Sequence, residues 1–195
     1  MSSYKIFETH AHYDDEAFDE DRDVLLGSMD ENGIQEVVNV CASIDSLEKT
    51  KALMEKYSFV YGAFGIHPDD AELVTEEVLD KVRECCGLEK AVAVGEIGLD
   101  YYWHKEAGEH ELQKKVFRQQ MEIARELHMP FMVHSREAAA DTLDLVKDCV
   151  NEGMYGGIIH CFSYGKEMAK EYLNMGLYLG IGGVVTFNNA RKVKE

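Results

Sequence analysis

Five short apolar runs in this chain each end on a histidine or a glutamate. They are IFETHAH with His10 and His12, YGAFGIH with His67, AVAVGE with Glu96, FMVH with His134, and GGIIH with His160. Buried parallel strands read as short continuous hydrophobic runs, and an enzyme built on them places its chemistry at their carboxyl ends. Because imidazole and carboxylate groups bind divalent cations, the repeated pattern predicts a metal site assembled from several strands.

One of these runs carries two histidines, His10 and His12, separated by a single residue. Residues i and i+2 of a strand point to the same side, so both imidazoles can reach one ion. H-x-H by itself is a weak signal, but Glu96, His134 and His160 each close a run of their own. A carboxylate such as Glu96 can bridge two cations, and a pair roughly 3.5–4 Å apart activates water and stabilises an in-line phosphoryl displacement. We therefore expect two divalent cations, Mg, Mn or Zn, and a hydrolytic reaction.

The apolar runs alternate with amphipathic segments along the whole chain. The runs begin near Tyr4, Glu36, Val60, Ala91, Pro130, Gly156 and Leu177. Such alternation predicts βα units in a parallel sheet, and here an α/β, TIM-like (β/α) barrel with seven of its eight strands. We expect residues 1–195 to form one domain and to lack the C-terminal part of the barrel. An open doubly wound sheet is the alternative, but it gathers ligands at one crevice rather than from strand after strand.

Start and stop signals delimit the helices between these runs. Ser46 is expected to cap LEKTKALMEKY, and Thr75 to cap EEVLDKVREC, which ends at Gly87. The longest amphipathic segment covers about 109–128. No linker or low-complexity tract divides the chain.

Composition limits the classes of protein that fit. No apolar stretch reaches the ~18 to 20 residues of a membrane helix, and MSSYKIFETH lacks the pattern of a secretory signal, so we expect a cytoplasmic protein with no membrane partner. The five cysteines are odd in number and have no C-x-x-C spacing, which predicts reduced thiols. Cys161 follows His160 and is expected to point away from the site. No sequence feature indicates a protein partner.

The chain is strongly acidic, with 37 acidic and 20 basic residues and a net charge of −17. A protein that grips duplex DNA by neutralising phosphates carries a basic stripe, and this sequence has none. Any nucleic-acid substrate is therefore expected to be held weakly. Bound cations and one or two arginines would supply the local positive charge.

Three further residues are candidates for contact with a substrate. His67 is a candidate catalytic residue that could contact a phosphate, or else a buried supporting histidine. Arg136 follows His134 at the rim, where a guanidinium could bind phosphate in a bidentate manner or form a surface ion pair. Tyr101 lies in the loop after Glu96, where an aromatic ring could stack on a nucleobase or pack into the core.

These motifs together resemble those of the TatD-related deoxyribonucleases, a branch of the metal-dependent amidohydrolase-like barrels. The resemblance covers nearly the whole chain and rests on ETHAHYDDEAFDED, GIHPDDA, AVGEIGLDYYW, MPFMVHSREAAADT and GGIIHCFS. It implies a TIM-like barrel that hydrolyses DNA phosphodiesters with divalent metals, often as a 3′-5′ exonuclease. By the same resemblance, His10 and His12 hold the first metal, Glu96 bridges both, and His134 and His160 hold the second.

The chain departs from the family pattern in two places. Glu8 stands where the family usually has aspartate. The family's last ligand, an aspartate after the eighth strand that is also the expected general base, has no counterpart in the sequence. The principal hypothesis is a DNA phosphodiesterase in which Glu96 is catalytic. The alternatives are a metal-dependent hydrolase of a small ester, lactone or amide, and a non-catalytic metal-binding remnant if the chain is naturally this short.

Overall fold

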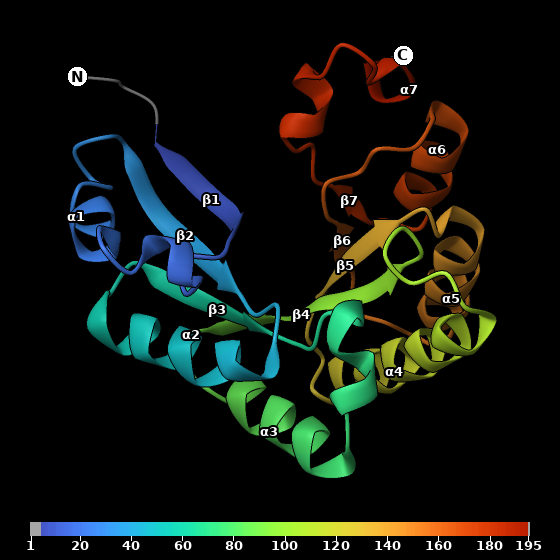
Figure 1. The fold of residues 1–195 in the computed structure, drawn as a ribbon, viewed down its shortest axis with the longest axis horizontal. Coiled ribbons are helices and arrows are strands. Elements are labelled where there is room, and N and C mark those ends of the chain that lie inside the picture. The colour runs from blue at the N-terminus through green and yellow to red at the C-terminus, as the bar shows by residue number, and fades with distance from the viewer. Residues whose placement is uncertain (1–4, 195) are drawn as a thin grey trace.

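A single curled sheet of parallel strands forms the framework of the molecule. The computed structural model describes residues 5–194. Its strands are β1 (Ile6–Ala11), β2 (Ile34–Val40), β3 (Val60–Phe64), β4 (Ala91–Asp100), β5 (Phe131–Arg136), β6 (Gly157–Ile159) and β7 (Tyr178–Leu179). They pair in the order of the chain, and all the pairs are parallel. Figure 1 shows the sheet curled into a half-barrel with β1 and β7 at its two edges.

This architecture confirms the predicted TIM-like α/β fold with seven strands. A doubly wound sheet would reverse its strand order near the middle, whereas this one runs from β1 to β7 without reversal. Among the described residues β7 is not paired with β1, so the sheet is open between these edges. The predicted start of the first strand, Tyr4, lies outside the described residues.

Helices cover the outer, convex side of the sheet (Figure 1). The α-helices are α1 (Arg22–Gly27), α2 (Ile44–Lys56), α3 (Glu76–Cys86), α4 (Ala107–Glu126), α5 (Ala139–Asn151), α6 (Lys166–Asn174) and α7 (Arg191–Lys194). Short 3-10 segments are η1 (Glu16–Phe18), η2 (Pro68–Leu73) and η3 (Gly183–Thr186). Between residues 5 and 194, we find no helix with both the length and the apolar character needed to cross a membrane.

The start of α2 differs from the prediction. Ser43, rather than Ser46, is the N-cap, and its hydroxyl accepts the backbone N–H of Ser46. Ser46 lies three positions into the helix, where its N–H is one of the donors that a cap must satisfy. Thr75 caps α3 as expected by accepting the N–H of Val78.

Apolar side chains pack on both sides of the sheet. The main core lies between the sheet and the outer helices and includes the fully buried Phe64, Ile97 and Phe117. A smaller cluster on the inner side contains Ala93 and Met132. This inner side borders an apolar cavity of about 940 Å³ that also contacts residues of β1, β6 and β7. The two clusters hold the strands in register, and this register sets where their carboxyl ends lie.

Candidate metal centre

The carboxyl ends of the strands surround one cavity of about 460 Å³. Seven of the residues predicted from the sequence lie at this site. His12, His67, Glu96, His134, Arg136 and His160 line the cavity. His10, on β1, contacts Glu96 and His12 beside it. The residues at the ends of these strands therefore lie around one common location, and their roles as metal ligands stay predictions.

A first group of ligand atoms forms around Oε2 of Glu96. Nε2 of His10 lies 3.3 Å and Nε2 of His12 lies 3.6 Å from this oxygen. The two nitrogens are 3.2 Å apart. Nδ1 of His12 is 2.7 Å from the carbonyl oxygen of Val40 and donates to it, which leaves Nε2 with a free lone pair directed at the group.

The chemistry of this group fits a divalent cation. Nδ1 of His10 is buried and has no hydrogen-bond partner among the described residues, so the ring makes its polar contacts in the site through Nε2. Imidazole nitrogen and carboxylate oxygen are the donors used by Zn and Mn, and Mg accepts carboxylate. The three donor atoms lie within 4.8 Å of one another.

A second group forms around the other carboxylate oxygen of Glu96. Oε1 lies 3.0 Å from Nδ1 of His134, and the ligand atoms of His67, Glu96 and His134 all lie within 4.8 Å of one another. The rings of His67 and His134 meet edge to face at 4.3 Å. Each oxygen of Glu96 thus faces a different set of imidazoles, an arrangement suited to a bridging carboxylate.

The charges of Glu96 and His134 depend on each other. Burial by itself would raise the pKa of the Glu96 carboxyl, but hydrogen bonds from His10 and His134 hold this pKa well below its usual range. Burial lowers the pKa of His134, whereas hydrogen bonds to Asp100 and Glu96 outweigh this effect and raise it to about 9. In the metal-free protein a protonated His134 therefore balances the carboxylate.

His160 lies against the first group rather than the second. Its ring stacks on that of His10, with the centroids 3.4 Å apart and the planes 12° apart. Burial lowers the pKa of His160 to about 4, so the ring is neutral at pH 7 and keeps a nitrogen lone pair. The structure brings His67, and not His160, within joint reach of Glu96 and His134. Ligation of the second metal by His160 stays a prediction.

A bulge in β4 directs Glu96 into the site. Ala93 and Glu96 are an odd number of residues apart, yet both face the inside of the sheet. The register of β4 against β5 shifts between Val94 and Ile97, which resets the alternation. Beyond the bulge, Gly98 has φ +144° and passes so close to β5 that a Cβ would lie 2.0 Å from the carbonyl oxygen of His134.

Tyr101 is not among the residues that line the cavity, and its contact with substrate stays a prediction. Its ring stacks on His110 at 3.6 Å, and its hydroxyl donates to Asp141 at 2.7 Å. The next two residues, Tyr102 and Trp103, lie beside Arg136 instead. The reason is the turn after β4, which directs Tyr101 toward the helices and the following rings toward the rim.

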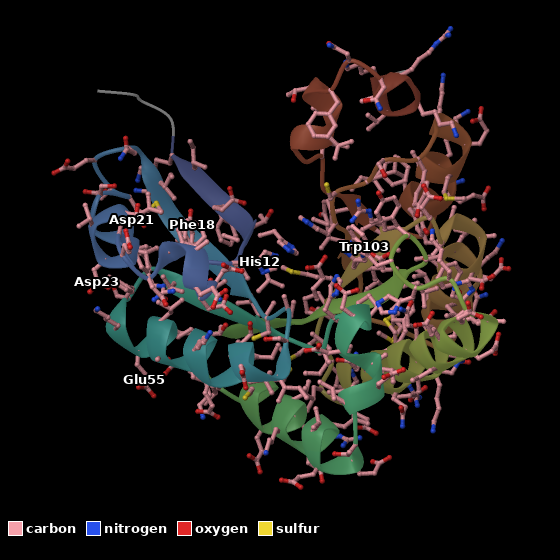
Figure 2. All side chains as sticks on the ribbon, in the orientation of Figure 1. His12, Phe18, Asp21, Asp23, Glu55 and Trp103 are labelled. Atoms are coloured by element: carbon pink, nitrogen blue, oxygen red, sulfur yellow. The ribbon has the colours of Figure 1, made fainter. Side chains whose placement is uncertain are left out.

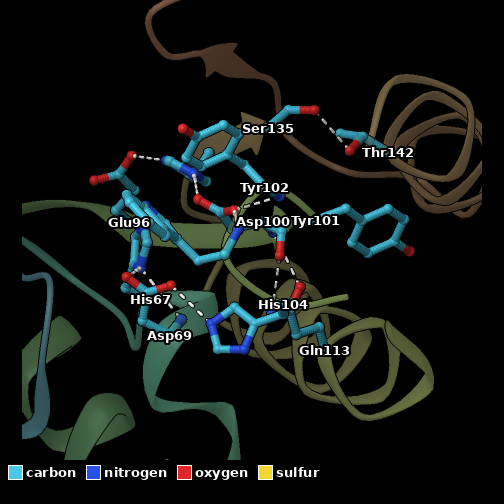
Figure 3. Close-up of polar contacts among 12 residues, drawn as sticks. His67, Asp69, Glu96, Asp100, Tyr101, Tyr102, His104, Gln113, Ser135 and Thr142 are labelled. Carbon is cyan, nitrogen blue, oxygen red and sulfur yellow. Dashed lines mark hydrogen bonds and ion pairs between the residues drawn. The ribbon is translucent and has the colours of Figure 1, made fainter. Parts of the chain in front are cut away.

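Two residues for which the sequence patterns predicted no role support the site. Asp100 contacts Nε2 of His134 at 3.2 Å, and Asp69 contacts Nδ1 of His67 at 3.3 Å (Figure 3). The sequence could have indicated Asp100, because it lies an even number of residues after Glu96 on the same strand and such residues face the same side of a sheet. Cys161 lines the cavity rather than pointing away. Its φ of +45° lies in the left-handed region, where strand alternation no longer applies.

A buried polar network around Asn39 of β2 fixes the turn that follows β1 and His12. The N–H of Tyr13 donates to Oδ1 of Asn39 at 2.7 Å, and Nδ2 of Asn39 donates to Oδ1 of Asp14 at 2.8 Å. Asn39 and Asp14 are both buried. Buried polar groups that satisfy each other restrict the backbone, so His12 is held in place from β2.

The family assignment agrees with this geometry. A sequence model of the family described as "TatD related DNase" matches residues 7–195. The chain belongs to this family. The metal-dependent hydrolase YabD of Bacillus subtilis is 39% identical over 190 residues, covering 97% of this chain and 73% of YabD. The 3′-5′ ssDNA/RNA exonuclease TatD of Cronobacter sakazakii is 32% identical over 168 residues, covering 86% of this chain and 63% of that protein.

Solved structures of TatD-family proteins have the same fold. The Escherichia coli TatD homologue YjjV superposes with a TM-score of 0.84 at 26% identity, covering 93% of this chain and 70% of YjjV. A TatD-family hydrolase from Entamoeba histolytica gives a TM-score of 0.80 at 26% identity, covering 92% of this chain and 66% of that structure. The predicted membership in the TatD-related family is confirmed.

Proposed function

We propose that this chain hydrolyses phosphodiester bonds of DNA at a centre that holds two divalent cations. The observation that carries the proposal is the position of Glu96. One of its carboxylate oxygens faces His10 and His12, and the other faces His134. Membership in the TatD-related DNase family and the name of the exonuclease relative support DNA as the substrate.

The side chains divide into two sets around Glu96. His10 and His12 would hold the first cation, His134 the second, and Glu96 would bridge both. His160 and His67 are the further candidates for the second cation. When bound, the cations would activate the attacking water and neutralise the charge that develops on the leaving oxygen. Mg, Mn and Zn all suit this set of donors.

Arg136 and His67 complete the proposed site around the substrate. Arg136 lies two residues after His134 on β5, so both side chains face the same cavity. Its guanidinium would bind a non-bridging phosphate oxygen, and His67 would contact the same phosphate. With a net charge of −17 on the chain, DNA is held by these local contacts and therefore weakly. We infer 3′-5′ removal of nucleotides from the name of the exonuclease relative.

The test combines metal analysis with a nuclease assay. Protein purified without chelator is analysed for metal content, then stripped and assayed on single-stranded DNA with added Mg, Mn or Zn. We expect nucleotide release that depends on the added metal. Glu96→Gln should lose at least one metal equivalent and on the order of 10²-fold or more in kcat, because it removes the bridging charge.

Glu77→Gln, an exposed position on α3, is the matched control and should keep both metal and activity. A panel of carboxyl esters, lactones and amides is assayed in parallel. Hydrolysis of that panel without nucleotide release would favour the small-molecule alternative. Metal binding without turnover of any substrate would favour a non-catalytic role.

A further inference from the structure

Two exposed aromatic rings and an arginine adjoin the candidate metal centre. Tyr102 is 41% and Trp103 is 65% exposed, and their rings meet at 83° with the centroids 4.7 Å apart. The guanidinium carbon of Arg136 lies 4.0 Å from the ring centre of Tyr102 and 5.5 Å from that of Trp103. In Figure 2, Trp103 and His12 lie on opposite sides of the opening in the curled sheet.

The turn that carries these rings is held firmly. Oδ1 of Asp100 accepts the backbone N–H of Tyr102 at 2.8 Å and that of Trp103 at 3.0 Å. From α4, the side chain of Gln113 accepts the N–H of Asp100 at 3.0 Å and donates to its carbonyl oxygen at 3.3 Å. Because the backbone is fixed by buried hydrogen bonds, the rings are exposed without being free to collapse onto the surface.

The same carboxylate also links the turn to the metal centre. Oδ2 of Asp100 lies 3.2 Å from Nε2 of His134, while Oδ1 holds the turn (Figure 3). Arg136, which lines the cavity, lies on the same strand as His134 and faces the same way. The position of the rings relative to the ligand His134 is therefore set by one side chain.

This combination is specific for one kind of ligand. A single exposed aromatic residue is ordinary on a protein surface. Here two perpendicular rings border a guanidinium that lines the cavity of candidate metal ligands. An aromatic face stacks on any nucleobase, and a guanidinium binds the adjoining phosphate. In a duplex both faces of an internal base are already covered by stacking, so only an unpaired base offers a free face.

We propose that Tyr102, Trp103 and Arg136 form a stacking site for one unpaired nucleobase next to the scissile phosphate. Trp103 provides the exposed face, Tyr102 supports Arg136, and Arg136 contacts the phosphate. The inference rests on the proposed nuclease function and adds to it that the substrate is recognised as a single strand with a base present. These groups do not distinguish one nucleobase from another, and they do not distinguish deoxyribose from ribose.

Trp103 is the only tryptophan of the chain, so its fluorescence reports on this site alone. Metal-loaded protein is titrated with a phosphorothioate oligothymidylate, which resists hydrolysis, and with an abasic oligomer that has the same number of linkages. We expect the oligothymidylate to quench the fluorescence and to bind about tenfold more tightly than the abasic oligomer, the effect of stacking one base.

The variants Trp103→Leu and Tyr102→Leu test the rings directly. Their affinity is measured by anisotropy of a labelled oligothymidylate and should fall about fivefold to tenfold, with the loss of activity lying mainly in KM. Tyr155→Leu is the control, because Tyr155 is 71% exposed but precedes β6, at the opposite end of the sheet. Its affinity should equal that of the wild type.

Equal binding of the abasic oligomer and the oligothymidylate would overturn the stacking site, as would an unchanged affinity in Trp103→Leu or the absence of any binding. Nuclease activity that persists in that case leaves the proposed function intact. Conversely, base-dependent quenching without hydrolysis of ordinary DNA under any added metal would refute the nuclease while supporting the stacking site. The two failures are therefore distinguishable.

Discussion

The carboxylate of Asp100 is shared between a candidate metal ligand and a substrate-binding turn. One oxygen contacts His134 and the other accepts two backbone N–H groups. Because this group is buried, replacing its charge has a larger effect than at the surface. Asp100 is therefore a positioning residue. Its effect can be measured as a change in the pKa of the neighbouring His134.

We expect Asp100→Asn to lower the pKa of His134 in the metal-free protein. The value is about 9 in the wild type, and a neutral amide stabilises the imidazolium less than a carboxylate does. An NMR titration of the imidazole in chelator-treated protein measures this pKa. Asp148→Asn, at an exposed position of α5, is the control. An unchanged pKa of His134 in Asp100→Asn would show that Asp100 does not stabilise the imidazolium.

A second prediction concerns His104, which lies between Asp69 and Glu109. Nε2 is 3.0 Å from Asp69, and Nδ1 is 3.3 Å from Glu109. Burial lowers the pKa of His104, but the hydrogen bonds to both carboxylates outweigh it and raise the pKa above its usual value. Hydrogen bonds from His67, opposed by burial and reinforced by His104, lower the pKa of Asp69 to about 2.

The raised pKa of His104 fixes the pH window of its contribution. Its stabilisation is fully present below the unfolded pKa of about 6.5 and is lost as the pH rises through the higher folded value. That of Asp69 is present above about 3.9 and is lost as the pH falls toward 2. His104→Gln should therefore lower Tm most near pH 5 to 6, and the loss in the free energy of unfolding should stay below about 1 kcal/mol because these groups are partly exposed. A Tm difference that grows between pH 6 and 9 would contradict this sign.

At the scale of elements, α4 holds the ends of two strands through buried glutamines. Gln120 accepts the N–H of Ile66 at 2.7 Å and donates to its carbonyl oxygen at 3.0 Å, directly before His67. Gln113 makes the equivalent pair with Asp100. Each amide replaces the ladder partners that a strand loses where it ends. The helix thereby positions His67 and the turn after β4.

Gln120→Leu should destabilise the fold and displace His67. The N–H and carbonyl groups of Ile66 would stay buried without partners, at a cost of about 2 to 4 kcal/mol in the free energy of unfolding. Urea denaturation measures this loss, and the activity assay should show a reduced kcat. Gln119→Leu, the adjacent and less buried position, is the matched control and should stay within about 0.5 kcal/mol of the wild type. Equal stabilities of the two variants would rule out the anchoring role.

At the scale of the whole molecule, an acidic surface surrounds one small basic contact. The net charge is −17, and Arg136 is the arginine that lines the cavity. Proteins that neutralise many phosphates lose affinity steeply with salt, with a slope of about −0.7 per phosphate for single strands. A site with one such contact should give a slope of log K against log salt shallower than about −1.

Anisotropy titrations of oligothymidylate between 50 and 300 mM KCl measure this slope. Arg136→Gln should make the slope shallower, because it removes one of the positive charges that displace counterions. Lys81→Gln, an exposed lysine on α3, should leave the slope unchanged. A wild-type slope of about −3 or steeper would mean that other basic residues hold the strand.

The framework of the molecule follows from the sequence alone. Hydrophobic periodicity and the residues that begin and end helices and strands are local properties of the chain. Seven apolar runs predict seven parallel strands, and Thr75 and Gly87 correctly bound α3. The rule that parallel strands present their carboxyl ends at one edge also places His12, Glu96 and His160 around one cavity. The sequence pattern predicts Ser46 as a cap because both Ser43 and Ser46 lie near the helix start, and only the backbone conformation selects Ser43.

The arrangement within the cavity was decided by tertiary structure. The β4 bulge turns Glu96 inward, the left-handed backbone at Cys161 brings its thiol to the cavity, and the Asp100 turn places Tyr102 rather than Tyr101 beside Arg136. Each of these is a departure from regular alternation set by contacts between segments far apart in the chain. Periodicity determines which residues reach the end of a strand, whereas packing between strands and helices determines which of them face one another.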